Sequence, residues 1–339
     1  MSMVTFKKNT VFLMVILSGD WYTYTTMTQA QQILQLQSWH LKFFQEKSRS
    51  CLTGKNTTII IIDSASKQNF SACITIGQIA INSADGESIL PPAVIGQKNE
   101  NRSPWSAIKK QKTYSILKNH ENISLTLIRQ LAPDATIISI PILDEQGYST
   151  QEQFYQALVA ALQYNPDIVH LGFQILDFDL TKKLEKKIYK ILKRFKCIIV
   201  PLGNNIPFSN FPPKLPNIFT IASFACKNNK YPISSFCNSK RQADFIMPGE
   251  DLQVIIPDQY KTGRNFIKIT VSGTSFAAAL MTGQIAYLLQ CFHKNITHVQ
   301  KFLKKNSTIL DASWREHVRY GFASTENLQQ PNVRIRPIM

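Results

Sequence analysis

The chain of 339 residues lacks the cysteine patterns that mark metal sites or disulfide frameworks. Its six cysteines are scattered without a C-x-x-C pair, and several lie in apolar runs, as Cys197 does in CIIV. This spacing is typical of buried free thiols and indicates neither a zinc site nor a disulfide framework. Carboxylates clustered in the manner of a calcium site are not found either. From these residues we identify no cofactor and no metal site.

Nucleic-acid-binding motifs are also missing, although the chain is basic. Lysine and arginine number 38 against 22 acidic residues, and the net charge is +16 at pH 7. Such a charge favours anionic partners. However, the basic residues are spread along the sequence, with no zinc-finger spacing, RNP motif or arginine-rich arm. We expect no nucleic-acid partner; steeply salt-dependent DNA or RNA binding would indicate the opposite.

Long apolar segments are absent beyond the N-terminus. There, FKKNTVFLMVILSG (6–19) places two lysines before a short apolar run, and TQA follows at 28–30. Two alternatives stay open: a signal peptide cleaved after Ala30, or a buried strand or membrane-proximal anchor. No other stretch is long and apolar enough to span a bilayer. The location is therefore open between the cytoplasm and export by a short N-terminal signal.

Short β-rich runs alternate with helical ones from residue 57 onward. The run TTIIIID is apolar throughout, as a parallel strand buried on both faces must be. Strand–helix–strand alternation of this length predicts an α/β fold with three α/β/α layers and a mostly parallel central sheet. We expect strands at 57–63, 135–143, 166–173, 197–203 and 217–224, and helices at 151–164 and 184–195. We divide the chain into an N-terminal segment (1–30), one domain (31–310) and a C-terminal tail (311–339).

Polar residues follow three of the apolar runs, and parallel sheets gather functional groups at such strand ends. Asp63 ends the first run, Asn204 follows CIIVPLG, and Ser275 follows FIKITVSG before a long apolar helix. Ser275 is either part of a loop that caps a buried helix or a nucleophile at a helix N-terminus. A serine nucleophile needs a base. Among the six histidines, His120 opens a helix-like segment and fits best, whereas His170 lies inside a strand.

These residues and their neighbours resemble the subtilisin-like serine peptidases (subtilases) over roughly residues 31 to 305. The order Asp63, His120, Ser275 is that family's order. GTSFAAALMTG resembles its GTS-x-[AS]-x-P-x-x-[AS]-G block. IIIIDSA, HENISLTLI with LAPDATI, DIVHLGF, IIVPLGNN, PISSFCN and DFIMPGE resemble six further blocks in the family's order.

The resemblance implies a serine endopeptidase that hydrolyses peptide bonds. It assigns the nucleophile to Ser275, the base to His120 and the orienting carboxylate to Asp63. It assigns the side-chain donor of the oxyanion hole to Asn204, with Asn205 as the fallback. It assigns substrate binding to the strand residues His170, Leu171 and Gly172. The implied partner is a peptide or protein, either varied proteins or one dedicated precursor peptide, and calcium is implied by the resemblance alone.

Several positions depart from the family pattern. Glu121 and Asn122 replace the Gly-Thr that follows the histidine, Ala65 replaces a glycine, Ala279 a proline and His170 a serine. An alternative therefore stays open: a subtilase-like protein that binds peptides but cleaves them poorly.

Secreted subtilases resemble one another in a folded propeptide that is cleaved off after folding. Here only about thirty residues precede the family-like lead-in LQLQSWHLKFF, which begins at Leu34. A small independent domain needs roughly 50 residues. We expect the chain to fold without an intramolecular chaperone and to lose at most a signal peptide at Ala30.

Overall fold

A nine-stranded sheet forms the centre of the computed structural model, in the order β12-β13-β9-β8-β7-β6-β3-β5-β4. The pairings from β13 to β4 are parallel, and β12 alone is antiparallel, at one edge. Its strands are β3 (Thr58–Ser64), β4 (Cys73–Thr75), β5 (Thr136–Leu143), β6 (Ile168–Leu171), β7 (Ile198–Pro201), β8 (Ile218–Phe224), β9 (Ala243–Pro248), β12 (Ser307–Thr308) and β13 (Val318–Ala323). The structure describes residues 14–17, 20–23, 40, 43–44, 52–64, 73–75, 120–143, 149–173, 182–204, 211–238, 241–257 and 266–325.

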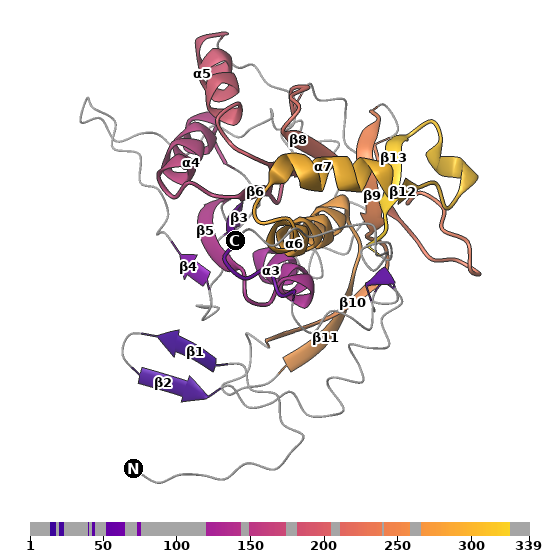
Figure 1. Cartoon of the computed structure of the whole chain (residues 1–339), viewed down its shortest axis with the longest axis horizontal. Helices are drawn as coiled ribbons and strands as arrows, with labels where there is room; N and C mark the ends of the chain where they lie inside the picture. The colour runs from indigo at the N-terminus through magenta and orange to yellow at the C-terminus, as the bar shows by residue number, and fades with distance from the viewer. Residues whose placement is uncertain are drawn as a thin grey trace, which may run out of the picture.

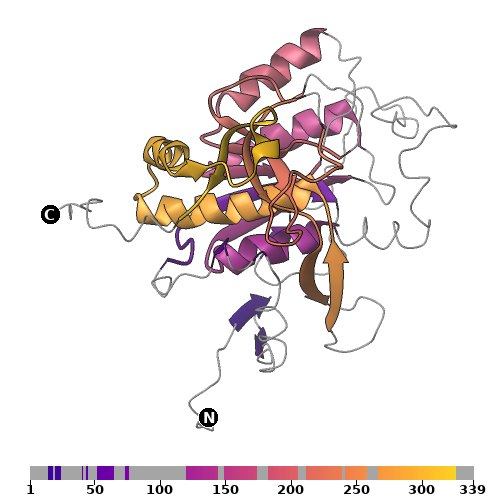
Figure 2. The same cartoon turned by 90° about the vertical axis from the view of Figure 1, so that its right-hand side faces the viewer.

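Helices cover both faces of this sheet (Figures 1 and 2). The side chains of β3 alternate between two apolar cores: Ile59 and Ile61 pack with α3 and α6, and Ile60 and Ile62 pack with α4 and α5. This period of two is what a strand buried on both faces requires. The predicted three-layer α/β/α fold is thereby confirmed. The helices are α3 (His120–Leu131), α4 (Gln151–Gln163), α5 (Lys182–Leu192), α6 (Thr274–Cys291) and α7 (Ile296–Lys305).

Helix α6 lies against α3 at very short range. A methyl group at Gly283 would lie 2.8 Å from the carbonyl oxygen of Ile128 and 3.0 Å from Cβ of Leu131. Only a residue without a side chain leaves room for this approach. Because α3 begins with His120 and α6 with Thr274 and Ser275, this contact brings the ends that carry the candidate base and nucleophile into one region.

A hairpin of β10 (Leu252–Pro257) and β11 (Phe266–Val271) forms a separate two-stranded sheet that projects beside α3 (Figure 1). In the N-terminal segment, β1 (Met14–Leu17) pairs antiparallel with β2 (Asp20–Thr23). Ala30, the predicted cleavage position, lies outside the described residues. Among the described helices, none alone combines the length and apolar character needed to cross a bilayer; α6 and α7 do so only as a pair joined across a 117° bend.

The predicted domain boundary at residue 310 is wrong. The segment assigned to a C-terminal tail (311–339) contributes β13, which pairs with β9 in the main sheet. It also contributes the 3₁₀ turn η4 (Ala312–Trp314), whose tryptophan is fully buried with its ring centroid 5.1 Å from that of Phe224. The domain therefore extends at least to Thr325.

Candidate active site

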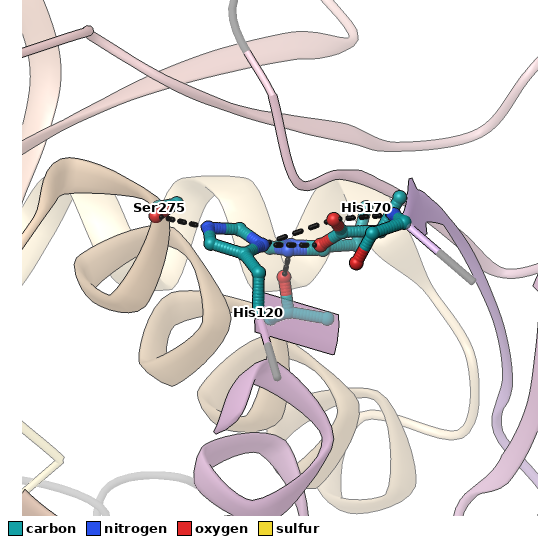
Figure 3. A network of polar contacts seen from close by, with 6 residues as sticks. His120, His170 and Ser275 are labelled. Atoms are coloured by element: carbon teal, nitrogen blue, oxygen red, sulfur yellow. Dashed lines mark hydrogen bonds and ion pairs between the residues drawn. The ribbon is translucent and has the colours of Figure 1, made fainter. Parts of the chain in front are cut away.

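Asp63, His120 and Ser275 form one hydrogen-bonded line at the carboxyl edge of the sheet, and Figure 3 shows His120 and Ser275 within it. Nδ1 of His120 lies 2.9 Å from Oδ2 of Asp63 and 3.0 Å from Oδ1. Nε2 of His120 lies 2.8 Å from Oγ of Ser275. Asp63 and His120 are 57 positions apart in the chain, and His120 and Ser275 are 155 apart. They meet because β3, α3 and α6 each begin or end at this edge.

The hydrogen bonds determine which nitrogen of His120 carries the proton. A carboxylate only accepts hydrogen bonds, so Nδ1–H donates to Asp63. This leaves a lone pair on Nε2, which accepts the hydrogen bond from the hydroxyl of Ser275. The exposed fraction of the His120 side chain is 16%, and the Asp63 side chain is fully buried. The backbone N–H of Ser64 donates a further 2.6 Å bond to Oδ1 of Asp63 and holds the carboxylate in place.

The environment raises the pKa of His120 above its usual 6.5. Burial by itself lowers the pKa, because it disfavours the charged form. The charge of Asp63, the hydrogen bond to Asp63 and the charge of the buried Glu121 together outweigh burial and raise it. The site therefore favours an imidazolium, which is the species that forms when a histidine takes a proton from a hydroxyl.

Asn204 lies at the same edge, with its side-chain amide held in one orientation. Its Oδ1 accepts hydrogen bonds from the backbone N–H and from the hydroxyl of Thr274, both at 2.9 Å. The Nδ2 group then lies near Ser275: a methyl group at Gly273 would lie 3.4 Å from both Nδ2 of Asn204 and Oγ of Ser275. Cys237 pairs with Asn204 as an isolated β-bridge and steadies its loop. The fallback residue, Asn205, lies outside the described residues.

The residues predicted to bind substrate lie at the end of β6 and directly after it. The side chains of His170 and Leu171 are fully buried, and Leu171 belongs to the core under α4 and α5, on the sheet face opposite Asp63. The buried side chains of His170 and Leu171 leave the backbone as the group that can meet a substrate, and substrate binding by His170, Leu171 and Gly172 stays a prediction. Gly172 lies against the carboxylate of Asp63. Contact between a peptide and the backbone at Gly172 remains a prediction.

Comparison with known proteins identifies a family. The family model described as the subtilase family (Peptidase_S8) matches residues 114–322. The chain belongs to the subtilase family. Among curated relatives, this subtilase is 22% identical over 264 residues to "Minor extracellular protease Epr" of Bacillus subtilis (strain 168), covering 75% of the chain and 35% of that protein. It spans 35 to 52% of the length of the curated relatives it matches.

Solved structures show the same fold at low sequence identity. Fervidolysin from Fervidobacterium pennivorans, a keratinolytic enzyme related to subtilisin, matches with a TM-score of 0.61 and 14% identity, over 84% of this chain and 44% of that one. Patellamide maturation protease PatG matches with a TM-score of 0.52 and 20% identity, over 79% of this chain and 88% of that one. The subtilisin-like architecture is thus shared with proteins of different named activities.

Two features of this subtilase's site escaped sequence reasoning. Thr274 was read only as part of the GTS block, yet its hydroxyl also accepts a 3.0 Å bond from the N–H of Gly203 and so ties the Asn204 loop to α6. Glu121 was read only as a departure from the family pattern, yet it is buried and its charge acts on His120. Within the described residues there is no group of three or more His, Cys, Asp or Glu placed to hold a metal ion.

Proposed function

We propose that this subtilase is a serine endopeptidase that cleaves peptide bonds with Ser275 as nucleophile. The observation that carries the proposal is the line of hydrogen bonds from Asp63 through His120 to Ser275, at 2.9 and 2.8 Å. A serine hydroxyl is a poor nucleophile near neutral pH, and a histidine base within hydrogen-bond reach is what activates it. The fixed Nδ1–H tautomer of His120 leaves the basic lone pair facing that hydroxyl.

In the proposed mechanism, Oγ of Ser275 attacks the carbonyl carbon of the scissile bond while Nε2 of His120 takes its proton. The resulting imidazolium is stabilised by the charge of Asp63, which remains ionised. His120 then gives the proton to the departing amine, and the peptide's acyl group stays on Ser275 as an ester. A water molecule, deprotonated by His120, hydrolyses the ester and restores the hydroxyl.

The negative oxygen of the tetrahedral intermediate needs donors that are in place beforehand. The backbone N–H of Ser275 lies in the first turn of α6, where helix N–H groups have no partner four residues earlier. The Nδ2 group of Asn204 is the second donor, oriented by the two bonds that its Oδ1 accepts from Thr274. We therefore assign the oxyanion hole to these two groups.

For the substrate, we propose a dedicated precursor peptide rather than varied proteins. Support comes from the likeness to PatG, which is named as a maturation protease and which this chain covers over 88% of its length.

The test is cleavage of a proteome-derived peptide library and of casein, analysed by mass spectrometry. Wild type is compared with Ser275→Ala, which keeps the fold and removes the nucleophile. We expect wild type to cleave a narrow set of sequences in the library and to degrade little casein. Ser275→Ala should cleave no peptide in the library and no casein. Broad casein degradation would overturn the precursor substrate. Peptide binding without any cleavage would favour a catalytically weak, peptide-binding subtilase.

A further inference from the structure

A second line of hydrogen bonds joins the sheet to α6 beside the triad. Nδ1 of His170, on β6, lies 2.9 Å from Oγ1 of Thr282 on α6. The hydroxyl of Thr282 in turn donates a 2.9 Å bond to the carbonyl oxygen of Ala278, one turn earlier in the same helix. Figure 3 shows His170 in the same view as His120 and Ser275. All three residues of the line are fully buried.

The direction of these bonds fixes the state of His170. Because the Thr282 hydroxyl hydrogen goes to Ala278, its oxygen accepts from Nδ1–H of His170. Nε2 then carries only a lone pair, and this atom has no hydrogen-bond partner within the part of the chain that the structure describes. A buried lone pair costs less than a buried, unpaired N–H or a charge. Burial accordingly lowers the pKa of His170 to about 4, so the ring is neutral.

Strand register places His170 on the same sheet face as the triad. His170 pairs with Ile61 in the parallel β3–β6 ladder, and Asp63 lies two residues beyond Ile61 on the same face. The charges of Asp63 and His120 both act on the pKa of His170, the first raising and the second lowering it. On α6, Ser275, Ala278 and Thr282 follow at helical spacings of three and four, which form one face.

Two separate connections therefore link the sheet to one face of α6. The first runs from β3 through His120 to Ser275, and the second runs from β6 through His170 to Thr282. Packing at Gly283 and the hydrogen bonds of Thr274 and Gln290 also hold α6, and the bond between His170 and Thr282 adds a directional contact about two turns from Ser275 on the face that carries the hydroxyl. Rotation of α6 would change the distance from Oγ of Ser275 to Nε2 of His120, which is 2.8 Å.

We propose that His170 is a positioning residue, whose hydrogen bond to Thr282 fixes the rotation of α6 and thereby holds Ser275 at its distance from His120. The proposal rests on the proposed serine nucleophile. The polar character of the His170–Thr282 pair supports the proposal. A histidine and a threonine buried among aliphatic side chains are costly to desolvate, and a hydrogen bond between them fixes an orientation that apolar packing does not. The family block that this strand resembles has a serine at the position of His170, so the His170–Thr282 hydrogen bond is a feature of this chain and not of the block.

The test compares four variants that separate the hydrogen bond from packing. Thr282→Val keeps the shape of Thr282 but removes its oxygen, and Thr282→Ser keeps the hydroxyl. His170→Leu removes the donor, and His170→Asn keeps an N–H near the position of Nδ1. For each, kcat and KM on a peptide that wild type cleaves are measured together with the melting temperature. The downfield proton resonance of His120 Nδ1–H, which reports its bond to Asp63, is recorded as well.

We expect Thr282→Val and His170→Leu to lower kcat by roughly 10- to 100-fold with KM nearly unchanged, because small misplacements of reacting groups have effects of that size. Thr282→Ser and His170→Asn should recover most of kcat, and the double variant Thr282→Val/His170→Leu should lose little more than either single one. The resonance should move in the two disruptive variants and return in the two conservative ones. Loss of melting temperature with kcat and the resonance unchanged would overturn the proposal, since the pair would then be structural only.

Failure of the proposed function would look different. A wild-type protein that cleaves no peptide would remove the kinetic arm, and the resonance comparison would still decide whether the bond between His170 and Thr282 controls how Ser275 meets His120. A resonance identical in all five proteins would contradict the positioning role in either case.

Discussion

The carboxylate of Asp63 occupies the space in which any side chain at Gly172 would lie. A methyl group at Gly172 would come within 1.9 Å of Oδ2 of Asp63 and 2.5 Å of its carboxyl carbon. The register of β3 and β6 produces this contact, because Ile62 pairs with Leu171 and the next residues of the two strands are Asp63 and Gly172. The position of the Asp63 carboxylate thus requires a glycine at 172. The backbone N–H of Gly172 also donates a 3.0 Å hydrogen bond to the carbonyl oxygen of Ile62.

Gly172→Ala should therefore disable the triad without unfolding the protein. The added methyl group must push the Asp63 carboxylate away from His120, and we expect turnover to fall by about 100-fold, as for other misplaced reacting groups. Steady-state kinetics with a peptide substrate provide the measurement. In an Asp63→Ala background the same substitution should have little further effect, because its target is gone. A full additional loss in that background would show that Gly172 acts through something other than Asp63.

Thr274→Val should lower kcat through Asn204. The substitution removes one of the two bonds that orient the Asn204 amide, as well as the bond to the N–H of Gly203. Removing the donor itself in Asn204→Ala should cost about 10²- to 10³-fold in kcat, and Thr274→Val should cost less. KM should change little in both, because the contact strengthens in the transition state. Thr274→Ser is the matched control and should resemble wild type; a pure KM effect in Asn204→Ala would contradict the oxyanion role.

The sequence predicted the framework because parallel strands buried on both faces must be apolar at every position. The run at 57–63 and its successors therefore identified the central strands to within one or two residues. In contrast, β13 (VRYGFA) is short and carries a charged residue and a glycine, so it was placed in the C-terminal tail. Its place in the sheet depends on pairing with β9, which no local pattern in the segment expresses.

The candidate site was predicted in its members but not in its geometry. Apolar periodicity alone did not select His120; the order of residues in a resembling family did. The distances depend on how closely α3 approaches α6, and this is set by Gly283 packing on the backbone of Ile128. The sequence did not show which sheet face His170 and Leu171 take, because a strand's two faces are equivalent in its sequence. Only the register with β3 shows that Leu171 faces the opposite core.

Glu121→Gln should move the acid limb of the pH–rate profile to lower pH. His120 must be neutral to act as a base, so activity rises as the pH increases through its pKa, which lies above 6.5. The charge of Glu121 contributes to that elevation, and removing the charge lowers the pKa of His120. Profiles of kcat/KM against pH for wild type and variant make the comparison. Glu185→Gln, on the exposed face of α5, is the control, and an equal shift in both variants would argue against a local effect.

Gln290→Leu should destabilise the domain at the far end of α6. The side-chain oxygen of Gln290 accepts three backbone hydrogen bonds, from Thr53 and Gly54 at 2.7 Å and from Lys55 at 3.1 Å. Leaving these donors without an acceptor should cost about 2 kcal/mol, or a fall of about 5 °C in melting temperature for a domain of this size. Differential scanning calorimetry measures the change. Gln290→Glu keeps an accepting oxygen and should retain most of the stability; equal losses in the two would assign the effect to packing.

The central claim is that Ser275 is a nucleophile activated by His120. The direct measurement is labelling of the purified protein by a fluorophosphonate probe, with the modified residue located by mass spectrometry. We expect phosphonylation at Ser275 alone in wild type and none in Ser275→Ala. His120→Ala should slow labelling strongly and should lower cleavage about as much as Ser275→Ala does, because triad members act as one unit. His170→Asn should be labelled nearly as fast as wild type. Labelling that persists in Ser275→Ala, or that is as fast in His120→Ala as in wild type, would contradict the account.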